Sequence, residues 1–149
     1  MFQRLRRPAM FCVILLTVLS PLVPQAAPDG EPFTFVGMTL PELFMRFGPP
    51  QSVHAARGQE HWQDDVVFAY GEGDFYVYRD RVWQVGLKSA YGMKVGDIKA
   101  VAILLFGENA RDEGDYLIYS FPSGGWPVSL RVNFIDGKVS AIFLYRSDY

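Results

Sequence analysis

The residues that could do chemistry in this chain are few and widely spaced. His54 and His61 are its only two histidines, and their separation matches none of the spacings with which a helix presents two metal ligands. His61 could hold a cation in a loop together with Asp64 and Asp65, but such loops usually carry charge for solubility. The residue pattern therefore predicts no metal site.

Three further segments lack the surroundings that catalysis or ion binding needs. The acidic run 112–115 does not follow the twelve-residue pattern of a calcium loop. The Ser-Gly-Gly segment at 123–125 has no strand-to-helix elbow around it, and the Gly-Glu-Gly segment at 71–73 lies between two expected strands. No arrangement of serine, histidine and acid stands out. We therefore predict a protein that is not an enzyme, with no catalytic residue, no cofactor and no small-molecule substrate.

The first 27 residues have the pattern of a secretory signal peptide. Three arginines fall within residues 1–7, an almost wholly apolar run covers 9–19, and Ala26 and Ala27 provide small residues at its exit. We expect cleavage there and a periplasmic or secreted location. An uncleaved anchor is the alternative, although the run is shorter than the roughly 20 residues that span a bilayer.

Removal of this segment would change both the cysteine content and the charge. The single cysteine, Cys12, lies inside the apolar run, so the mature chain would have no disulfide and no thiol nucleophile. Loss of three arginines from 14 basic residues leaves 11 against 16 acidic residues, a formal charge of −5. This acidic balance argues against a nucleic-acid partner.

Two helices are expected in the mature chain. The first begins after Thr39, where Glu42 completes a capping box, and stops at Gly48. The second runs over 96–106 and is apolar almost all round, so we expect it to sit more deeply than the first. Leu43 in the first helix and Leu105 in the second are predicted to be buried against a sheet.

Three strands are expected after each helix, and the two halves look alike. Gly37-Met38 and Gly92-Met93 open similar stretches at an offset of 55 residues. The expected strands cover 66–70, 75–79 and 82–88 in the first half, and 116–121, 128–134 and 139–145 in the second. The predicted fold class is α+β, with two tandem helix-plus-antiparallel-meander repeats and the helices packed on one face of the sheet. Residues 28–88 and 89–149 would be the repeats, joined in one integrated domain.

Alternation along the strands predicts which side chains stay open. In the second half, the apolar residues from Val128 to Phe134 share one face, which leaves Arg131 on the opposite face. Matching Tyr78 to Phe134 then places Phe75, Val77 and Arg79 on the same open face as Arg131. Such a patch predicts a partner-binding surface, with packing between the two halves as the alternative.

Aromatic residues in the connecting segments add to this surface. Trp62 and Trp126 fall in or beside loops, where large rings are favoured as interface anchors. The alternative is that each ring covers the core of its own half.

The arrangement resembles a known family. Gly37, Leu43, Gly48 and Pro49 in the first half are similar to the SmpA/OmlA (BamE) outer-membrane assembly domain. Gly92, Ile98, Gly107, Phe134, Asp136 and Val139 carry the same likeness in the second half. Two such units in tandem resemble the β-lactamase inhibitor protein family. The chain lacks the lipidated cysteine of the assembly lipoproteins and the disulfides of the inhibitor.

The resemblance implies a binder, in agreement with the survey of candidate sites. We expect an exported, non-enzymatic protein-binding module of the bacterial cell envelope, which engages a protein partner of unknown identity through the open sheet face and loop aromatics. The alternative is a structural or assembly component associated with the outer membrane, with peripheral membrane association.

Overall fold

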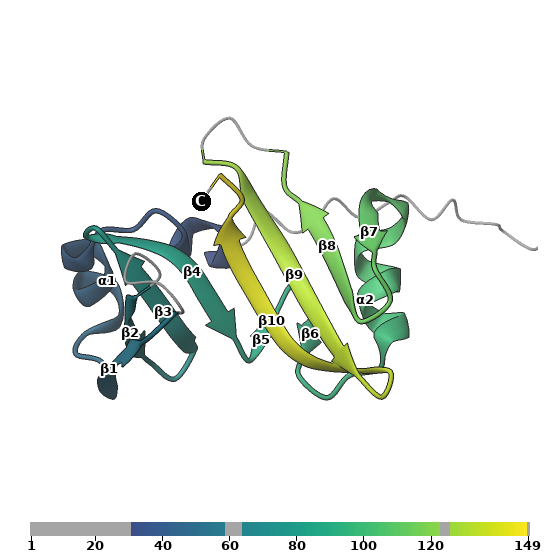
Figure 1. Ribbon diagram of the computed structural model, residues 1–149, viewed down its shortest axis with the longest axis horizontal. Helices are drawn as coiled ribbons and strands as arrows, with labels where there is room; N and C mark the ends of the chain where they lie inside the picture. Colours follow the sequence, from purple (N-terminus) through teal and green to yellow (C-terminus); the bar gives the residue numbers. More distant parts are fainter. Residues whose placement is uncertain (1–30, 59–63, 123–125, 149) are drawn as a thin grey trace, which may run out of the picture.

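The computed structural model describes residues 31–58, 64–122 and 126–148. Its main element is an eight-stranded antiparallel sheet with the strand order β1-β2-β3-β4-β10-β9-β8-β7 (Figure 1). The strands are β1 (Ser52–Ala56), β2 (Asp65–Ala69), β3 (Gly73–Tyr78), β4 (Arg81–Leu87), β7 (Ala110–Asp112), β8 (Tyr116–Ser120), β9 (Val128–Ile135) and β10 (Lys138–Arg146). Two short strands, β5 (Ser89–Ala90) and β6 (Met93–Lys94), pair in a separate small sheet.

The predicted fold class of two tandem helix-plus-meander repeats is wrong. Strand β4 pairs directly with β10, from Leu87 opposite Ile142 to Gln84 opposite Tyr145. Hydrogen bonding therefore runs unbroken through one large sheet, and only two short α-helices accompany it in the described part of the chain. The alternation of apolar and polar residues predicts which side chains of a strand face a helix. It does not predict which strands distant in the sequence pair with each other. The boundary predicted at residue 88 stays a prediction, and residues 1–27 lie outside the described residues.

The first helix, α1 (Leu40–Phe47), follows the short 3₁₀ helix η1 (Glu31–Phe35) and begins as the sequence predicts. The Thr39 side chain accepts a hydrogen bond from the Glu42 backbone, and the Glu42 carboxylate accepts one from the Thr39 backbone, which confirms the capping box. The expected burial of Leu43 is also confirmed, because its side chain is fully buried. The Phe47 ring lies 5.1 Å from that of Phe75 and so holds the helix on the sheet.

The second helix, α2 (Lys99–Phe106), is shorter than predicted and precedes the 3₁₀ helix η3 (Gly107–Asn109). Its first expected turn is absent because Ile98 keeps an extended backbone and forms an isolated β-bridge with Lys138. Ala102 and Phe106 are buried, but Leu105 is 39% exposed. The predicted burial of Leu105 is therefore wrong, although α2 has two buried residues where α1 has only Leu43. Only one stripe of a helix can face the sheet, however apolar its other sides are.

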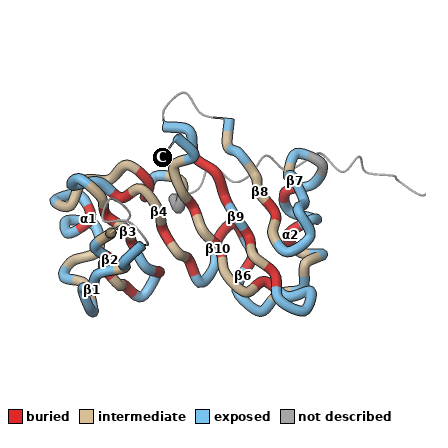
Figure 2. The backbone as a smooth tube through the Cα atoms, in the orientation of Figure 1, coloured by how far each residue is buried: buried red, intermediate tan, exposed pale blue. Residues whose placement is uncertain are grey.

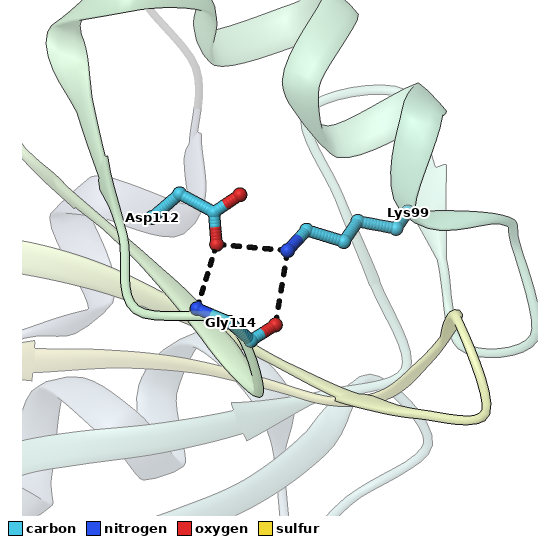
Figure 3. A network of polar contacts seen from close by, with 3 residues as sticks. All are labelled: Lys99, Asp112 and Gly114. Atoms are coloured by element: carbon cyan, nitrogen blue, oxygen red, sulfur yellow. Dashed lines mark hydrogen bonds and ion pairs between the residues drawn. The ribbon is translucent and has the colours of Figure 1, made fainter.

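A small polar network ties the start of α2 to the turn between β7 and β8 (Figure 3). The Lys99 ammonium donates to the Asp112 carboxylate at 2.8 Å and to the Gly114 carbonyl at 2.9 Å. The same carboxylate oxygen accepts a hydrogen bond from the Gly114 amide. These hydrogen bonds hold the pKa of Asp112 below its ordinary value, the bond from Lys99 being the largest cause.

Strands β1 and β7 form the two ends of the sheet and lie outside the strands expected from the sequence. Neither strand alternates, since all five residues of β1 are exposed or half-buried and β7 has only three residues. Figure 2 shows the contrast with β9, where buried and less buried residues alternate from Leu130 to Ile135 after three buried residues. In the described part of the chain, no helix is long and apolar enough to cross a membrane.

Candidate protein-binding face

The eight-stranded sheet has one face toward the helices and one face away from them. The face toward the helices carries the core, in a row of paired residues that crosses the sheet from Tyr119 through Leu130, Leu144, Val85 and Phe75 to Phe68. Helix α1 reaches this row through the contact of Phe47 with Phe75, and α2 reaches it through Phe106, whose ring lies 5.2 Å from that of Tyr119. We call the opposite face the outer face.

The structure corrects two of the predicted partner-binding residues. Phe75 is fully buried and Val77 is 6% exposed, so both belong to the core and neither lies on an open surface. Phe75→Ala would therefore open a cavity in the core. Tyr78, which was matched to Phe134 and so expected on the face toward the helices, lies on the outer face together with Tyr76.

The error comes from the turns. Matching Tyr78 to Phe134 implies one more residue in the turn after β9 than in the turn after β3. In the structure both turns have two central residues at positive φ, Arg79 and Asp80 in one, Asp136 and Gly137 in the other. Counting back from turns of equal length places Val77, and not Tyr78, on the same face as Phe134.

Cross-strand pairing defines the outer face. One row runs from Ser120 through Ser129, Tyr145, Gln84, Tyr76 and Val67 to His54. The next row runs from Arg111 through Ile118, Arg131, Phe143, Gly86, Asp74 and Ala69 to Ser52. Tyr116 lies opposite Asn133, beside the second row. Val67 and Ser129 in the first row are buried, at 1% and 2% exposed, and the other side chains of the two rows are half-buried or exposed.

Two aromatic rings lie beside Gly86 at the centre of the outer face, where the glycine leaves room for them. A Cβ atom at Gly86 would lie 3.4 Å from the Phe143 ring and 3.9 Å from the Tyr76 ring. The two rings therefore lie beside a strand position without a side chain, and both residues remain half-buried. Burial raises the pKa of Tyr76, and the nearby carboxylates of Asp74 and Asp65 act in the same direction. The centre of the outer face is thus aromatic, and its rings are partly shielded from water.

A hydrogen bond fixes a further aromatic residue on this face. Trp83 is the extra residue of a bulge in β4, where Val77 pairs with Val82 but Tyr76 pairs with Gln84. Its indole nitrogen donates to the Asp65 carboxylate on β2 at 3.0 Å. Burial raises the pKa of Asp65, while this hydrogen bond opposes the rise.

Arg131 supplies a cation at the other end of the face and is exposed, as the alternation of β9 predicts. It lies opposite Phe143 on β10, and its guanidinium lies 4.2 Å from the centre of the Tyr116 ring. Its Nε donates to the Asn133 side chain at 2.8 Å. Stacking and hydrogen bonding hold the planar cation in one orientation.

The remaining predicted residues lie in other places. Arg79 is exposed in the turn after β3, with its guanidinium 5.2 Å from the Tyr78 ring centre. Trp126 is 45% exposed and lies away from the aromatic centre, 3.8 Å from the Arg146 guanidinium and against the backbone of Gly37. Trp62 lies outside the described residues. A partner-binding role for Arg79, Arg131 and Trp126 stays a prediction.

The structure adds five aromatic residues that the sequence interpretation did not assign to a binding face: Tyr76, Tyr78, Trp83, Phe143 and Tyr145. The positions of Phe143 and Tyr145 follow from alternation along β10. Ile142 and Leu144 are buried, so the residues next to them in the strand must point to the opposite face. No sequence pattern predicts the bulge in β4 that orients Trp83.

Other features give little support for chemistry. Within residues 31–58, 64–122 and 126–148, no three His, Cys, Asp or Glu side chains gather in a way that could hold a metal ion. An open recess of about 680 Å³ lies beside the β5–β6 hairpin and is lined by Ser89, Tyr91, Lys94 and Asp97 among others. The Asp97 carboxylate accepts a hydrogen bond from the Lys94 backbone at 2.9 Å, and so is engaged in closing the turn.

Comparison with known proteins bears on the fold alone. No family model matches the chain, and no curated protein matches it either. Two solved structures are similar: a cysteine-rich secretory protein from Staphylococcus aureus and an extracellular protein containing an SCP domain from Bacillus anthracis. The first has 15% identity and a TM-score of 0.51, and the second has 8% identity and a TM-score of 0.50.

These comparisons correct the resemblance drawn from the sequence. The similar structures belong to SCP-domain proteins, so the likeness to the SmpA/OmlA (BamE) domain and to the β-lactamase inhibitor protein family is wrong. The alignments cover 82% and 81% of this chain but only 48% and 47% of the other two. The chain thus spans about half the length of the structures it matches, and both of those are described as secreted or extracellular.

Proposed function

We propose that this protein is an exported, non-enzymatic module that binds another protein through the outer face of its sheet. The observation that carries the proposal is the concentration of aromatic side chains there, with Tyr76 and Phe143 both beside Gly86. Large rings that remain half-exposed on a sheet face are hard to explain by the packing of the domain itself, and they are enriched where proteins bind each other.

The composition of the outer face favours a protein over a small molecule. Tyrosine, tryptophan and arginine dominate the residues that contribute most to protein–protein affinity, and the face provides Tyr145, Trp83 and Arg131 in one surface. The face extends across four neighbouring strands, β3, β4, β10 and β9. Small ligands prefer enclosed pockets, whereas protein partners bind broad surfaces.

The charges of the face give a partner an orientation. Asp74 on β3 is exposed toward one end, and Arg131 on β9 is exposed toward the other. Between them lie Gly86 and Phe143 in the same row of paired residues. A partner with a cation near Asp74 and a carboxylate near Arg131 would bind in one direction only, since charge complementarity sets register more than affinity.

Export to the periplasm or the medium is part of the proposal. The basic and apolar pattern of residues 1–27 supports it, and so does the secreted or extracellular description of the similar structures. A binder without a thiol after removal of Cys12 would suit an oxidising compartment.

Affinity capture with paired variants tests the proposal. The full chain is expressed in the native host with an affinity tag at its C-terminus, and captured proteins are compared between wild type and the double variant Tyr76→Ala/Arg131→Ala. The matched control is Ile103→Ala/Leu104→Ala, which removes side chains that are 45% and 81% exposed on α2 and away from the outer face. Thermal melts establish that each variant is folded.

We expect a protein that both wild type and the α2 control retain and the outer-face variant loses. The expected weakening is at least about thirtyfold, which corresponds to the roughly 2 kcal/mol of a hot-spot residue. Retention of every captured protein by a folded outer-face variant would contradict the proposal.

A further inference from the structure

The strand at one end of the sheet has no protection against further pairing. Among the described residues, β1 pairs only with β2, over five residue pairs without a register shift. Its sequence, Ser-Val-His-Ala-Ala, contains no lysine, acid or proline. Proteins normally protect such edges with charge, proline, bulges or very short strands, because unpaired N–H and C=O groups accept another strand.

The opposite end of the sheet has these protections. Strand β7 is only three residues long and carries Arg111 and Asp112. Glu113 follows directly and forms an ion pair with Arg111. Within the described residues, one edge of this sheet is therefore blocked and the other is open.

Exposed apolar side chains lie next to the open edge, on the face toward the helices. Val53 of β1 is 52% exposed and lies opposite Phe68, whose ring is 5.7 Å from that of Phe44. Val66 lies opposite Ala55 and is 44% exposed, and Phe44 itself is 41% exposed. The core of the domain therefore continues to the edge and remains uncovered there, as is typical of an interface.

We propose that β1 pairs in antiparallel orientation with β1 of a second copy of this chain. A two-fold axis perpendicular to the sheet would join the two sheets edge to edge, with the helices of both copies on the same side. Each residue of β1 must then pair with a residue whose side chain points to that same side. The register that pairs all five residues of β1 then sets His54 opposite His54 of the second copy and Val53 opposite Ala55. Proline at position 50 has no N–H to donate and ends the ladder.

A second copy fits this edge better than an unrelated extended peptide. The strand carries no lysine, arginine or carboxylate, so pairing with itself brings none of these like charges together. The two-fold axis also brings a second set of Phe44, Val53 and Val66 to the same side, where each apolar patch would cover the other. An added peptide strand would satisfy the backbone and leave much of this patch exposed. The inference is independent of the outer face, which remains open in such a dimer.

Cysteine cross-linking tests both the dimer and its register. Cys12→Ser removes the single native cysteine. In this background, the variants His54→Cys and Val53→Cys are each oxidised in solution and compared. Directly opposite residues have Cα atoms about 4.5–5.5 Å apart, within the range of a disulfide, whereas residue 53 would lie diagonally from its own copy and beyond that range. We expect a covalent dimer from His54→Cys, in at least about tenfold excess over Val53→Cys.

Sedimentation equilibrium gives the second readout. Wild type should be dimeric, and His54→Lys, which sets two ammonium groups opposite each other at an exposed position, should be a folded monomer by far-UV circular dichroism. Arg111→Ala at the blocked edge should leave the dimer unchanged. A monomeric wild type, a dimeric His54→Lys, or equal cross-linking at positions 53 and 54 would each overturn the proposal.

Discussion

The indole of Trp83 and the carboxylate of Asp65 are joined across strand β3, with Nε1 3.0 Å from Oδ1. The two residues come from β4 and β2, which flank β3 in the sheet. The bond satisfies the polar group of the indole and ties the ring to a neighbouring strand of the outer face. It therefore fixes an aromatic surface before any partner arrives.

The hydrogen bond between Trp83 and Asp65 leads to a prediction about the pKa of Asp65. Burial raises the pKa of Asp65 and the bond from Trp83 opposes the rise, so Trp83→Phe should raise the pKa further. Because the folded pKa exceeds the unfolded one, the folded state binds the proton more tightly, and stability falls as pH rises between the two values. NMR titration of the side-chain carboxyl measures the pKa directly. A lower pKa of Asp65 in Trp83→Phe would contradict the assignment of this bond.

Asp112 should behave in the opposite way. The bonds from Lys99 and from the Gly114 amide lower its pKa below 3.8, so Lys99→Met should raise it toward that value. The stabilising contribution is present above the unfolded pKa and is lost as pH falls through the lowered folded pKa. Asp148, whose pKa is lowered through Arg146, serves as the control and should not change. An unchanged Asp112 would show that the network in Figure 3 does not persist in solution.

Two leucines of different burial should differ in their contribution to stability. Leu43 on α1 is fully buried and Leu104 on α2 is 81% exposed. Leu43→Ala should lower the free energy of unfolding by about 2–5 kcal/mol, because it removes packing and leaves a cavity. Leu104→Ala should change it by less than about 0.5 kcal/mol. Urea denaturation measures both, and equal losses would mean that α2 is buried in solution.

Two neighbouring glycines should differ for a steric reason. A Cβ at Gly73 would lie 2.2 Å from the Gly86 carbonyl oxygen, a backbone atom that cannot move away without disturbing β4. Gly73→Ala should therefore destabilise the protein by about 1–3 kcal/mol or more. At Gly71 the nearest atom is the Gln51 side-chain nitrogen at 4.0 Å, so Gly71→Ala should be nearly neutral. Thermal unfolding of the two variants compares them, and a tolerated Gly73→Ala would place β3 and β4 further apart than described.

Local signals in the sequence predicted local structure well. Thr39 and Glu42 lie three residues apart and cap α1 through their own side chains, so four residues contain the whole motif. The alternation along β9 likewise predicted the exposure of Arg131, because a strand has only two faces.

Features that depend on distant pairing were not predictable in the same way. Strand β1 has no alternation because it lies at a sheet edge, and it is a strand only because β2 pairs with it. The side on which Phe75 lies depends on the length of the turn at Arg79 and Asp80, where two non-glycine residues adopt positive φ. One residue of difference in that turn reverses every side chain of β3, and with it the members of the binding face.

The most direct test of the outer face is site-specific photo-cross-linking in the producing cell. A benzoylphenylalanine replaces Phe143 at the centre of the face or, in the matched control, Leu104 on α2, and cross-linked products are separated by mass after irradiation. A protein-binding outer face predicts a discrete heterologous adduct from position 143 and none from position 104. An adduct from position 104 alone, or no adduct from position 143 in folded protein, would contradict it.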